Sequence, residues 1–269
     1  MSDIIKAIIL GIVEGLTEFL PVSSTGHLIL VSEFVDFTGD FAKLFEIVIQ
    51  LGAIMSVIVY FWHKLFPFGR SKTPVEKTQT WDLWKKTLVG VFPAILLGAT
   101  FGKHIQEYLF NPITVALALV IGGIALIILE RRKTQVQINS ISSLSYKTAF
   151  LIGIVQCLAM IPGTSRSAAT IIGAMFFGAS RVVAAEYSFF LAIPTLFAAS
   201  AYSLLKSGFN LDMSQVQLLV IGSIVSFLVA WLVIAGFMKF ITKRDFQPFG
   251  YYRIILGIFI LVYFTIITP

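Results

Sequence analysis

Two carboxylates stand one helical turn apart in the first apolar stretch of the chain. Glu14 and Glu18 are separated by four residues, so a helix places both on one face. Carboxylates in apolar surroundings share a proton, bind a cation, or orient a histidine that acts as a base. A structural ion pair with an arginine or lysine is the alternative reading.

A cluster of hydroxyl groups follows these carboxylates, in the segment "PVSSTGH" (21–27). Ser23, Ser24 and Thr25 precede a glycine and His27, and an apolar run then resumes. One such hydroxyl is typical of a helix N-cap, and a helix N-terminus attracts anions. Capping does not account for three hydroxyls beside a histidine. The pattern favours a hydroxyl nucleophile with a base nearby.

A second polar cluster, "PGTSRSAAT" (162–170), interrupts another apolar stretch. Its proline and glycine break a helix, and its polar side chains surround one cation. An arginine among hydroxyls at a helix start is typical of a phosphate or carboxylate receptor. Neutralisation of Glu14 or Glu18 is the alternative, and both can hold in the resting state. The candidate anion-binding residues are Gly163, Thr164, Ser165, Arg166, Ser167 and Thr170.

The composition places these clusters in a membrane protein. Hydrophobic residues make up 57% of the 269 and charged residues 13%, and the mean hydropathy is +0.91. Spans of roughly 20 apolar residues cross a bilayer. We therefore expect an all-α integral membrane protein with six transmembrane helices, at about 42–62, 85–103, 113–132, 184–206, 215–240 and 249–268.

The basic residues predict the orientation. The net charge of +6 does not indicate a nucleic-acid partner, because the lysines and arginines lie between the spans. The segments 63–86, 131–147 and 239–253 hold fourteen of them, whereas 103–112 and 206–214 hold two. Cytoplasmic loops carry the excess of positive charge. We therefore expect both termini on the outer side.

Two further segments, 1–40 and 148–182, consist of apolar stretches interrupted at the middle, and neither half can cross alone. Both are interpreted as re-entrant helix–loop–helix hairpins, in which irregular backbone is buried in protein. The sequence "GIVEGLTEFLPVSSTG" (11–26) also aligns with "GIVQCLAMIPGTSRS" (153–167).

This alignment predicts an internal repeat within a single membrane domain, 1–269. Repeat 1 (1–133) and repeat 2 (147–269) each contain one hairpin and three spans. An odd number of spans inverts the second copy. The polar segments at the turns of the two hairpins, 21–27 and 162–170, are called the tips, and the inversion lets them meet near the midplane of the membrane. The copies differ in charge, because one supplies acids, hydroxyls and a histidine and the other supplies an arginine. That division suits phosphoryl transfer better than a symmetric ion carrier.

The motifs "EGLTEFLPVSSTGH" (14–27) and "PGTSRSAAT" (162–170) resemble the undecaprenyl-diphosphate phosphatase family of bacteria, also called the bacitracin-resistance protein family. The resemblance implies an enzyme of the bacterial cytoplasmic membrane that removes the terminal phosphate of the C55 isoprenoid diphosphate and regenerates the carrier for peptidoglycan. It also implies a divalent cation and a pocket open to the outer face. The family's functional positions fall on Glu14, Glu18, Ser24, His27, Ser165, Arg166 and Thr170.

Our hypothesis assigns Ser24 as the nucleophile and His27 as general base and later acid, assisted by Glu18. Glu14 and Glu18 would hold Mg²⁺ or Ca²⁺. Phosphoryl oxygens would bind Arg166 and the remaining polar tip residues, which are Ser23, Thr25, Gly163, Thr164, Ser165, Ser167 and Thr170. His27 as nucleophile, with Ser24 as a phosphate ligand, stays open.

Other classes of protein share parts of this pattern. A transporter or flippase of an isoprenyl phosphate would have the same inverted hairpins. The acid-phosphatase-like lipid phosphatases share Ser-Gly-His and Ser-Arg elements, but this chain lacks their upstream Lys…Arg-Pro motif and their second catalytic histidine. A lipid diphosphate substrate and a homodimer are the expected partners.

Overall fold

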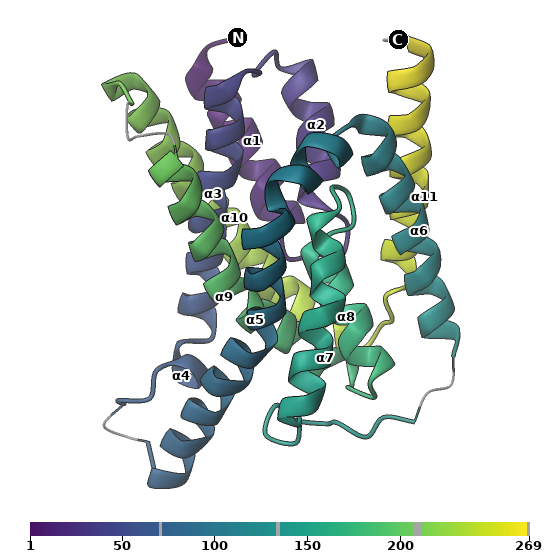
Figure 1. The fold of residues 1–269 in the computed structure, drawn as a ribbon. Helices are drawn as coiled ribbons and strands as arrows, with labels where there is room; N and C mark the ends of the chain where they lie inside the picture. Colours follow the sequence, from purple (N-terminus) through teal and green to yellow (C-terminus); the bar gives the residue numbers. More distant parts are fainter. Residues whose placement is uncertain (70–71, 133–134, 207–210, 268–269) are drawn as a thin grey trace.

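The structure is a computed structural model, and it describes residues 1–69, 72–132, 135–206 and 211–267 (Figure 1). Among the basic loop residues counted above, Arg70 and Lys133 lie outside these ranges, and the side chain of Lys103 is likewise not described. The end of the predicted span 249–268 also lies beyond them.

Six helices of the described residues are long and apolar enough to cross a membrane, which confirms the predicted number. Large apolar side chains such as those of Ile121, Leu232 and Ile255 stay exposed on them, as expected for surfaces that face lipid. The helices are α3 (Asp40–Tyr60), α5 (Pro74–Leu109), α6 (Pro112–Arg131), α9 (Arg181–Lys206), α10 (Met213–Ile241) and α11 (Gln247–Val262) together with its continuation η2 (Tyr263–Ile267).

Helix α5 begins earlier than the sequence predicted. The 63–86 segment was interpreted as a loop, but α5 already starts at Pro74, after the short helix α4 (Trp62–Leu65). The cause is a capping box: the Thr73 hydroxyl accepts from the Glu76 N–H at 3.3 Å, and the Glu76 carboxylate accepts from the Thr73 N–H at 2.7 Å. Proline at the first helical position adds to this start signal.

The two interrupted segments form helix pairs that return to the end where they began. The first pair is α1 (Asp3–Thr17) and α2 (Ser24–Phe34), and Lys6 Nζ ties its ends by donating to the Asp36 carbonyl at 2.7 Å. The second is α7 (Tyr146–Gln156), a 3₁₀ turn η1 (Cys157–Met160) and α8 (Arg166–Phe176), whose ends meet at an isolated bridge between Ile138 and Ala179. Their insertion as re-entrant hairpins stays a prediction.

The packing of the two halves follows a matching pattern. Helix α1 packs on α10, and α7 packs on α5. The aligned glycines make both contacts close, because a Cβ at Gly11 would overlap the carbonyl of Gly222, and one at Gly153 would overlap Gly90. The inverted repeat stays a prediction. Its requirement that equivalent helices have equivalent neighbours is met at these contacts.

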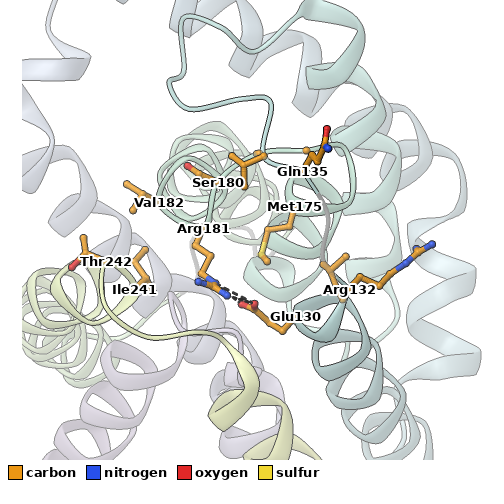
Figure 2. A pocket seen from close by; sticks show the side chains of 13 residues that line it. Glu130, Arg132, Gln135, Met175, Ser180, Arg181, Val182, Ile241 and Thr242 are labelled. Carbon is orange, nitrogen blue, oxygen red and sulfur yellow. Dashed lines mark hydrogen bonds and ion pairs between the residues drawn. The ribbon is translucent and has the colours of Figure 1, made fainter.

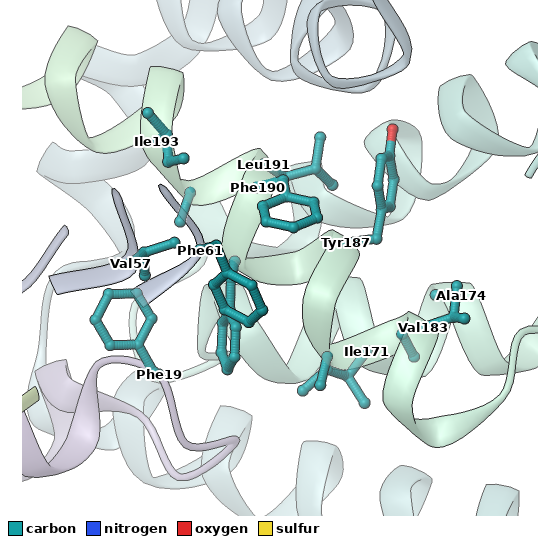
Figure 3. Packing of buried hydrophobic residues seen from close by; sticks show 14 of the residues in the cluster. Phe19, Val57, Phe61, Ile171, Ala174, Val183, Tyr187, Phe190, Leu191 and Ile193 are labelled. Carbon is teal, nitrogen blue, oxygen red and sulfur yellow. The ribbon is translucent and has the colours of Figure 1, made fainter. Parts of the chain in front are cut away.

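An aromatic cluster around α9 anchors the tip of the first pair. Phe19 lies next to this tip, and its ring meets that of Phe189 edge-on at 5.4 Å. Phe61 of the α3–α4 junction contacts Phe190 in the same way at 5.3 Å. Figure 3 shows Phe19, Val57, Phe61 and Phe190 gathered in this cluster. Such ring pairs contribute about 0.5–1.5 kcal/mol each beyond their buried area, so the cluster fixes the tip beside α9.

Candidate active site

The two tips start their second helices in the same way. Ser23 and Ser165 are the N-caps of α2 and α8, and both have a left-handed backbone, with φ of 73° and 69°. Each hydroxyl accepts from the N–H three residues on, at 3.3 Å in α2 and 3.2 Å in α8. Ser24 and Arg166 therefore occupy the same first helical position, where backbone N–H groups lack an intrahelical acceptor.

The Glu18 carboxylate joins the two tips. Its Oε2 accepts a hydrogen bond of 2.7 Å from Ser24 Oγ, and its Oε1 accepts one of 2.8 Å from Arg166 Nη2. The Glu18 side chain is 6% exposed and that of Arg166 10%, so this ion pair is largely shielded from solvent. A carboxylate bonded to both a hydroxyl and a guanidinium can take the proton of that hydroxyl. The guanidinium then lies close to the negative charge that develops as the hydroxyl oxygen attacks.

The Arg166 guanidinium is held on several sides but keeps a free donor. Nη1 donates to the Ser188 carbonyl at 3.0 Å, and the guanidinium carbon lies 5.8 Å from the Phe19 ring centroid. The buried Nε has no hydrogen-bond partner among the described residues. This N–H is therefore a donor without an acceptor, of the kind that binds an anion.

Glu14 is fully buried, and neither carboxylate oxygen has a hydrogen-bond partner in the described part of the chain. The aligned position in the second pair is Gln156, whose amide is also buried without a partner. An ionised carboxylate in such a place is costly unless it takes a proton or a cation. Its hard oxygen atoms suit Mg²⁺ or Ca²⁺.

His27 lies in an arrangement that the sequence did not predict. Its Nδ1 is 2.7 Å from the Ser23 carbonyl, and its Nε2 is 2.6 Å from the Tyr252 hydroxyl. Within the described ranges no hydrogen bond joins His27 to Ser24, whose hydroxyl is bound to Glu18 instead. The expected serine–histidine pair is therefore not formed in this arrangement.

Ser167 and Thr170, both predicted as substrate ligands, are fully buried. The Ser167 hydroxyl donates to the Leu20 carbonyl of the other tip at 2.8 Å. The Thr170 hydroxyl lies 2.6 Å from Ser188 Oγ and 2.9 Å from the Arg166 carbonyl. The Thr170 contacts support Arg166, and the Ser167 contact joins the two tips. Because both hydroxyls are buried and already bonded within the protein, the structure does not support their direct contact with substrate.

The other predicted ligands differ in their environment. Thr25 is half-buried, and its hydroxyl makes no hydrogen bond to the rest of the described chain. The backbone at Gly163 has a φ of 89°, and a Cβ there would overlap the main chain of Val115, so glycine is required. Thr164 is half-buried, and the Ser165 hydroxyl, besides capping α8, lies 3.0 Å from Ser167 Oγ.

Arg253 corrects one sequence assignment. It was counted as a loop residue, but it lies inside α11 and is completely buried. Its guanidinium donates to the carbonyls of Pro21 at 3.3 Å and Thr164 at 2.9 Å, one from each tip. It also reaches the carbonyls of Ala118, Leu119 and Gly163. The signal was present, because an arginine within the predicted span 249–268 is itself typical of a functional or structural centre.

Two cavities of the described chain contain none of the predicted site residues. One has a volume of about 380 Å³ and includes Glu130 and Arg181, whose ion pair is 2.6 Å long (Figure 2). The other, of about 430 Å³, includes Lys64 and Glu186, also paired at 2.6 Å. Both cavities are lined by hydroxyl, acidic and basic side chains, but neither includes a residue of the two tips.

Comparison with known proteins agrees with the motifs at the tips. Residues 7–259 match the family described as bacitracin resistance protein BacA. A Clostridioides difficile protein named undecaprenyl-diphosphatase 1 is 50% identical over 269 residues, 99% of this chain and 98% of that protein. An undecaprenyl-diphosphatase of Acetivibrio thermocellus is 49% identical over 268 residues, 98% of each chain. One of Limosilactobacillus fermentum is 47% identical over 274 residues, 99% of each.

Proposed function

The chain belongs to the bacitracin resistance protein family, and on this premise we propose that it removes the terminal phosphate of undecaprenyl diphosphate. It is a multi-pass membrane protein and a hydrolase of a phosphoric anhydride. The product, undecaprenyl phosphate, is the lipid carrier that peptidoglycan synthesis uses again. Removal of its diphosphate precursor agrees with the family's association with bacitracin resistance.

The observation that carries the chemistry is the bridge from Ser24 through Glu18 to Arg166, with bonds of 2.7 and 2.8 Å. In the proposed reaction Ser24 Oγ attacks the terminal phosphorus and gives its proton to Glu18. The Oγ–P bond forms, the bridging P–O bond breaks, and undecaprenyl phosphate leaves. Water then attacks the phosphoserine, which releases phosphate and restores the hydroxyl. This assigns the role of base to Glu18, because the Ser24 hydroxyl donates to Glu18 and no hydrogen bond joins it to His27 among the described residues.

Binding of the phosphoryl oxygens falls to the groups that lack partners. The Arg166 Nε–H and the first N–H groups of α2 and α8 are such donors. Charge develops on the terminal phosphoryl oxygens during transfer, and fixed donors in a water-poor site stabilise it. When substrate arrives, Arg166 exchanges part of its bond to Glu18 for phosphate.

A divalent cation fits the unpartnered carboxylate of Glu14, with Glu18 as the second protein ligand. The described residues contain no group of three or more His, Cys, Asp or Glu that could hold a metal ion. Mg²⁺ commonly uses one or two carboxylates together with substrate phosphates. We therefore assign the remaining ligands to the diphosphate itself. A bound cation would neutralise phosphate charge and polarise the phosphorus.

The orientation completes the proposal. Helix α4 and the segments 66–69, 135–145 and 242–246 lie at one end of the bundle, and the described parts of the two chain ends lie at the other (Figure 1). The excess of basic residues in these loops supports a cytoplasmic location for them, in the bacterial cytoplasmic membrane, with the termini and the opening of the site outside. A homodimer stays a prediction.

Phosphate release from a long-chain isoprenyl diphosphate in detergent tests the function. We expect release by the wild type, loss in Ser24→Ala and in Arg166→Ala, and loss on addition of a chelator. Substrate movement across vesicles without phosphate release, unaffected by Ser24→Ala, would instead indicate a flippase. Full activity of both variants would contradict the site.

A further inference from the structure

Helix α11 contributes a side chain to the active site that the sequence motifs do not contain. The Tyr252 hydroxyl is 2.6 Å from His27 Nε2, although the two residues are 225 positions apart. The ring planes differ by only 9°, and the centroids are 5.5 Å apart. Tyr252 is 44% exposed, whereas its neighbour Arg253 is fully buried and bonded to both tips. The buried arginine thus fixes the position of Tyr252 along the helix.

The partners of His27 define its tautomer. A carbonyl oxygen only accepts hydrogen bonds, so Nδ1, which faces the Ser23 carbonyl at 2.7 Å, carries the proton. In the neutral ring Nε2 is then an acceptor, and the Tyr252 hydroxyl donates to it. The hydrogen bonds run in one direction, from the phenol through the imidazole to the Ser23 carbonyl.

The end of this chain of hydrogen bonds is the peptide group that precedes the proposed nucleophile. The Ser23 carbonyl and the Ser24 N–H belong to the same peptide unit. That N–H is the first of α2 and has no intrahelical acceptor. A donor bonded to the carbonyl of a peptide increases the polarity of its N–H, because hydrogen bonds in series reinforce one another. The series of hydrogen bonds from Tyr252 through His27 to the Ser23 carbonyl therefore orients the Ser24 N–H and makes it a stronger donor toward an incoming phosphoryl group.

We propose that Tyr252 is a positioning residue: it holds His27 in the Nδ1–H tautomer, so that His27 fixes the Ser23–Ser24 peptide for binding of the transferred phosphoryl group. Its effect on rate rests on the phosphatase activity proposed above. The hydrogen bond between Tyr252 and His27 does not depend on that activity, and it can be measured without enzyme turnover.

The test uses Tyr252→Phe, which removes one oxygen atom. The matched control is Tyr251→Phe, because the Tyr251 hydroxyl accepts from Arg131 at 2.9 Å and makes no hydrogen bond to a described residue of the tips. The chain has only three histidines, so His63→Gln and His104→Gln leave His27 as the single ¹⁵N-histidine signal of the labelled protein in detergent. Kinetics and thermal unfolding are measured on the same samples.

We expect the ¹⁵N spectrum to show a protonated Nδ1 and an unprotonated Nε2, with the Nε2 resonance shifted in Tyr252→Phe and unshifted in Tyr251→Phe. The kcat of Tyr252→Phe should fall about five- to thirty-fold, as for the loss of one hydrogen bond in the transition state, with KM within about twofold. Unshifted resonances overturn the proposal, even if kcat falls. Shifted resonances with an unchanged kcat overturn its catalytic part. Absence of phosphatase activity in the wild type would contradict the proposed function, while the spectra would still decide the contact.

Discussion

Arg166 and Glu18 lie 148 residues apart in the chain and form an ion pair of 2.8 Å between the two tips. The pair joins the anion-binding helix start of one half to the hydroxyl-bearing helix start of the other. A buried ion pair contributes little net stability, because desolvation offsets the attraction. In the mechanism proposed above, the pair keeps the proposed base and a guanidinium next to the Ser24 hydroxyl.

Arg166→Lys should lower kcat by about 10²- to 10³-fold, the usual cost of removing a donor to developing charge. Lysine keeps the charge but cannot bind Glu18, the Ser188 carbonyl and a phosphoryl oxygen with the fixed geometry of a guanidinium. Phosphate release measures the effect, and Arg244→Lys, at an exposed loop position, is the control. Activity within threefold of wild type would show that only the charge matters.

Ser24→Ala should lower kcat by at least about 10³-fold, since no covalent intermediate can form. Ser140→Ala, at an exposed loop position away from the tips, is the control and should keep the wild-type activity. Rapid acid quenching of wild type with labelled substrate should trap an acid-stable phosphoserine at Ser24. An acid-labile phosphohistidine at His27 would reverse the assignment of nucleophile.

The sequence predicted those features that depend on local patterns. Apolar runs located the six spans, because a bilayer crossing needs a length that few other structures need. Pro21 and Pro162 marked the two interruptions, and the hydroxyls after them marked the helix starts. The ion pair between Glu18 and Arg166 was anticipated as one of two readings, and it holds in this structure.

The features that the sequence did not predict are contacts between residues that are far apart in the chain. Arg253 was assigned to a loop because a cluster of basic residues precedes it, and only packing shows that it reaches both tips. The partner of His27 was predicted to be Ser24, the nearest hydroxyl in the sequence after Thr25. The helix turns Ser24 toward Glu18 and His27 toward α11, so proximity in the chain was misleading.

Labelling of single cysteines tests the proposed orientation. In a Cys157→Ser background, a cysteine at the exposed position of Ser2 should react with a membrane-impermeant maleimide on intact cells or spheroplasts. A cysteine at exposed Ser140, in the basic loop before α7, should react only after the membrane is opened. The reverse pattern of labelling would place the termini in the cytoplasm.

Glu14→Gln should weaken the apparent affinity for Mg²⁺ by at least about tenfold, because it removes a carboxylate ligand while it keeps the shape of the side chain. The measurement is a Mg²⁺ titration of phosphate release after treatment with a chelator. Mn²⁺ binding followed by electron paramagnetic resonance, with a non-hydrolysable diphosphate present, gives a second readout. Glu33→Gln, on the exposed side of α2, is the matched control. An unchanged titration would remove Glu14 from the cation site.

Arg253→Lys should lower the free energy of unfolding by about 3 kcal/mol, and Arg253→Met by at least as much. The arginine donates to carbonyls of both tips and of α6, and a hydrogen bond from a charged donor contributes about 1.5–3 kcal/mol. Lysine has fewer donors and a shorter reach across the three segments, and methionine leaves the buried carbonyls without partners. The tips should then separate, so activity should fall along with the thermal unfolding temperature in detergent. If Arg253→Lys unfolds at the wild-type temperature, and thus behaves like the exposed variant Arg244→Lys, Arg253 does not hold the tips together.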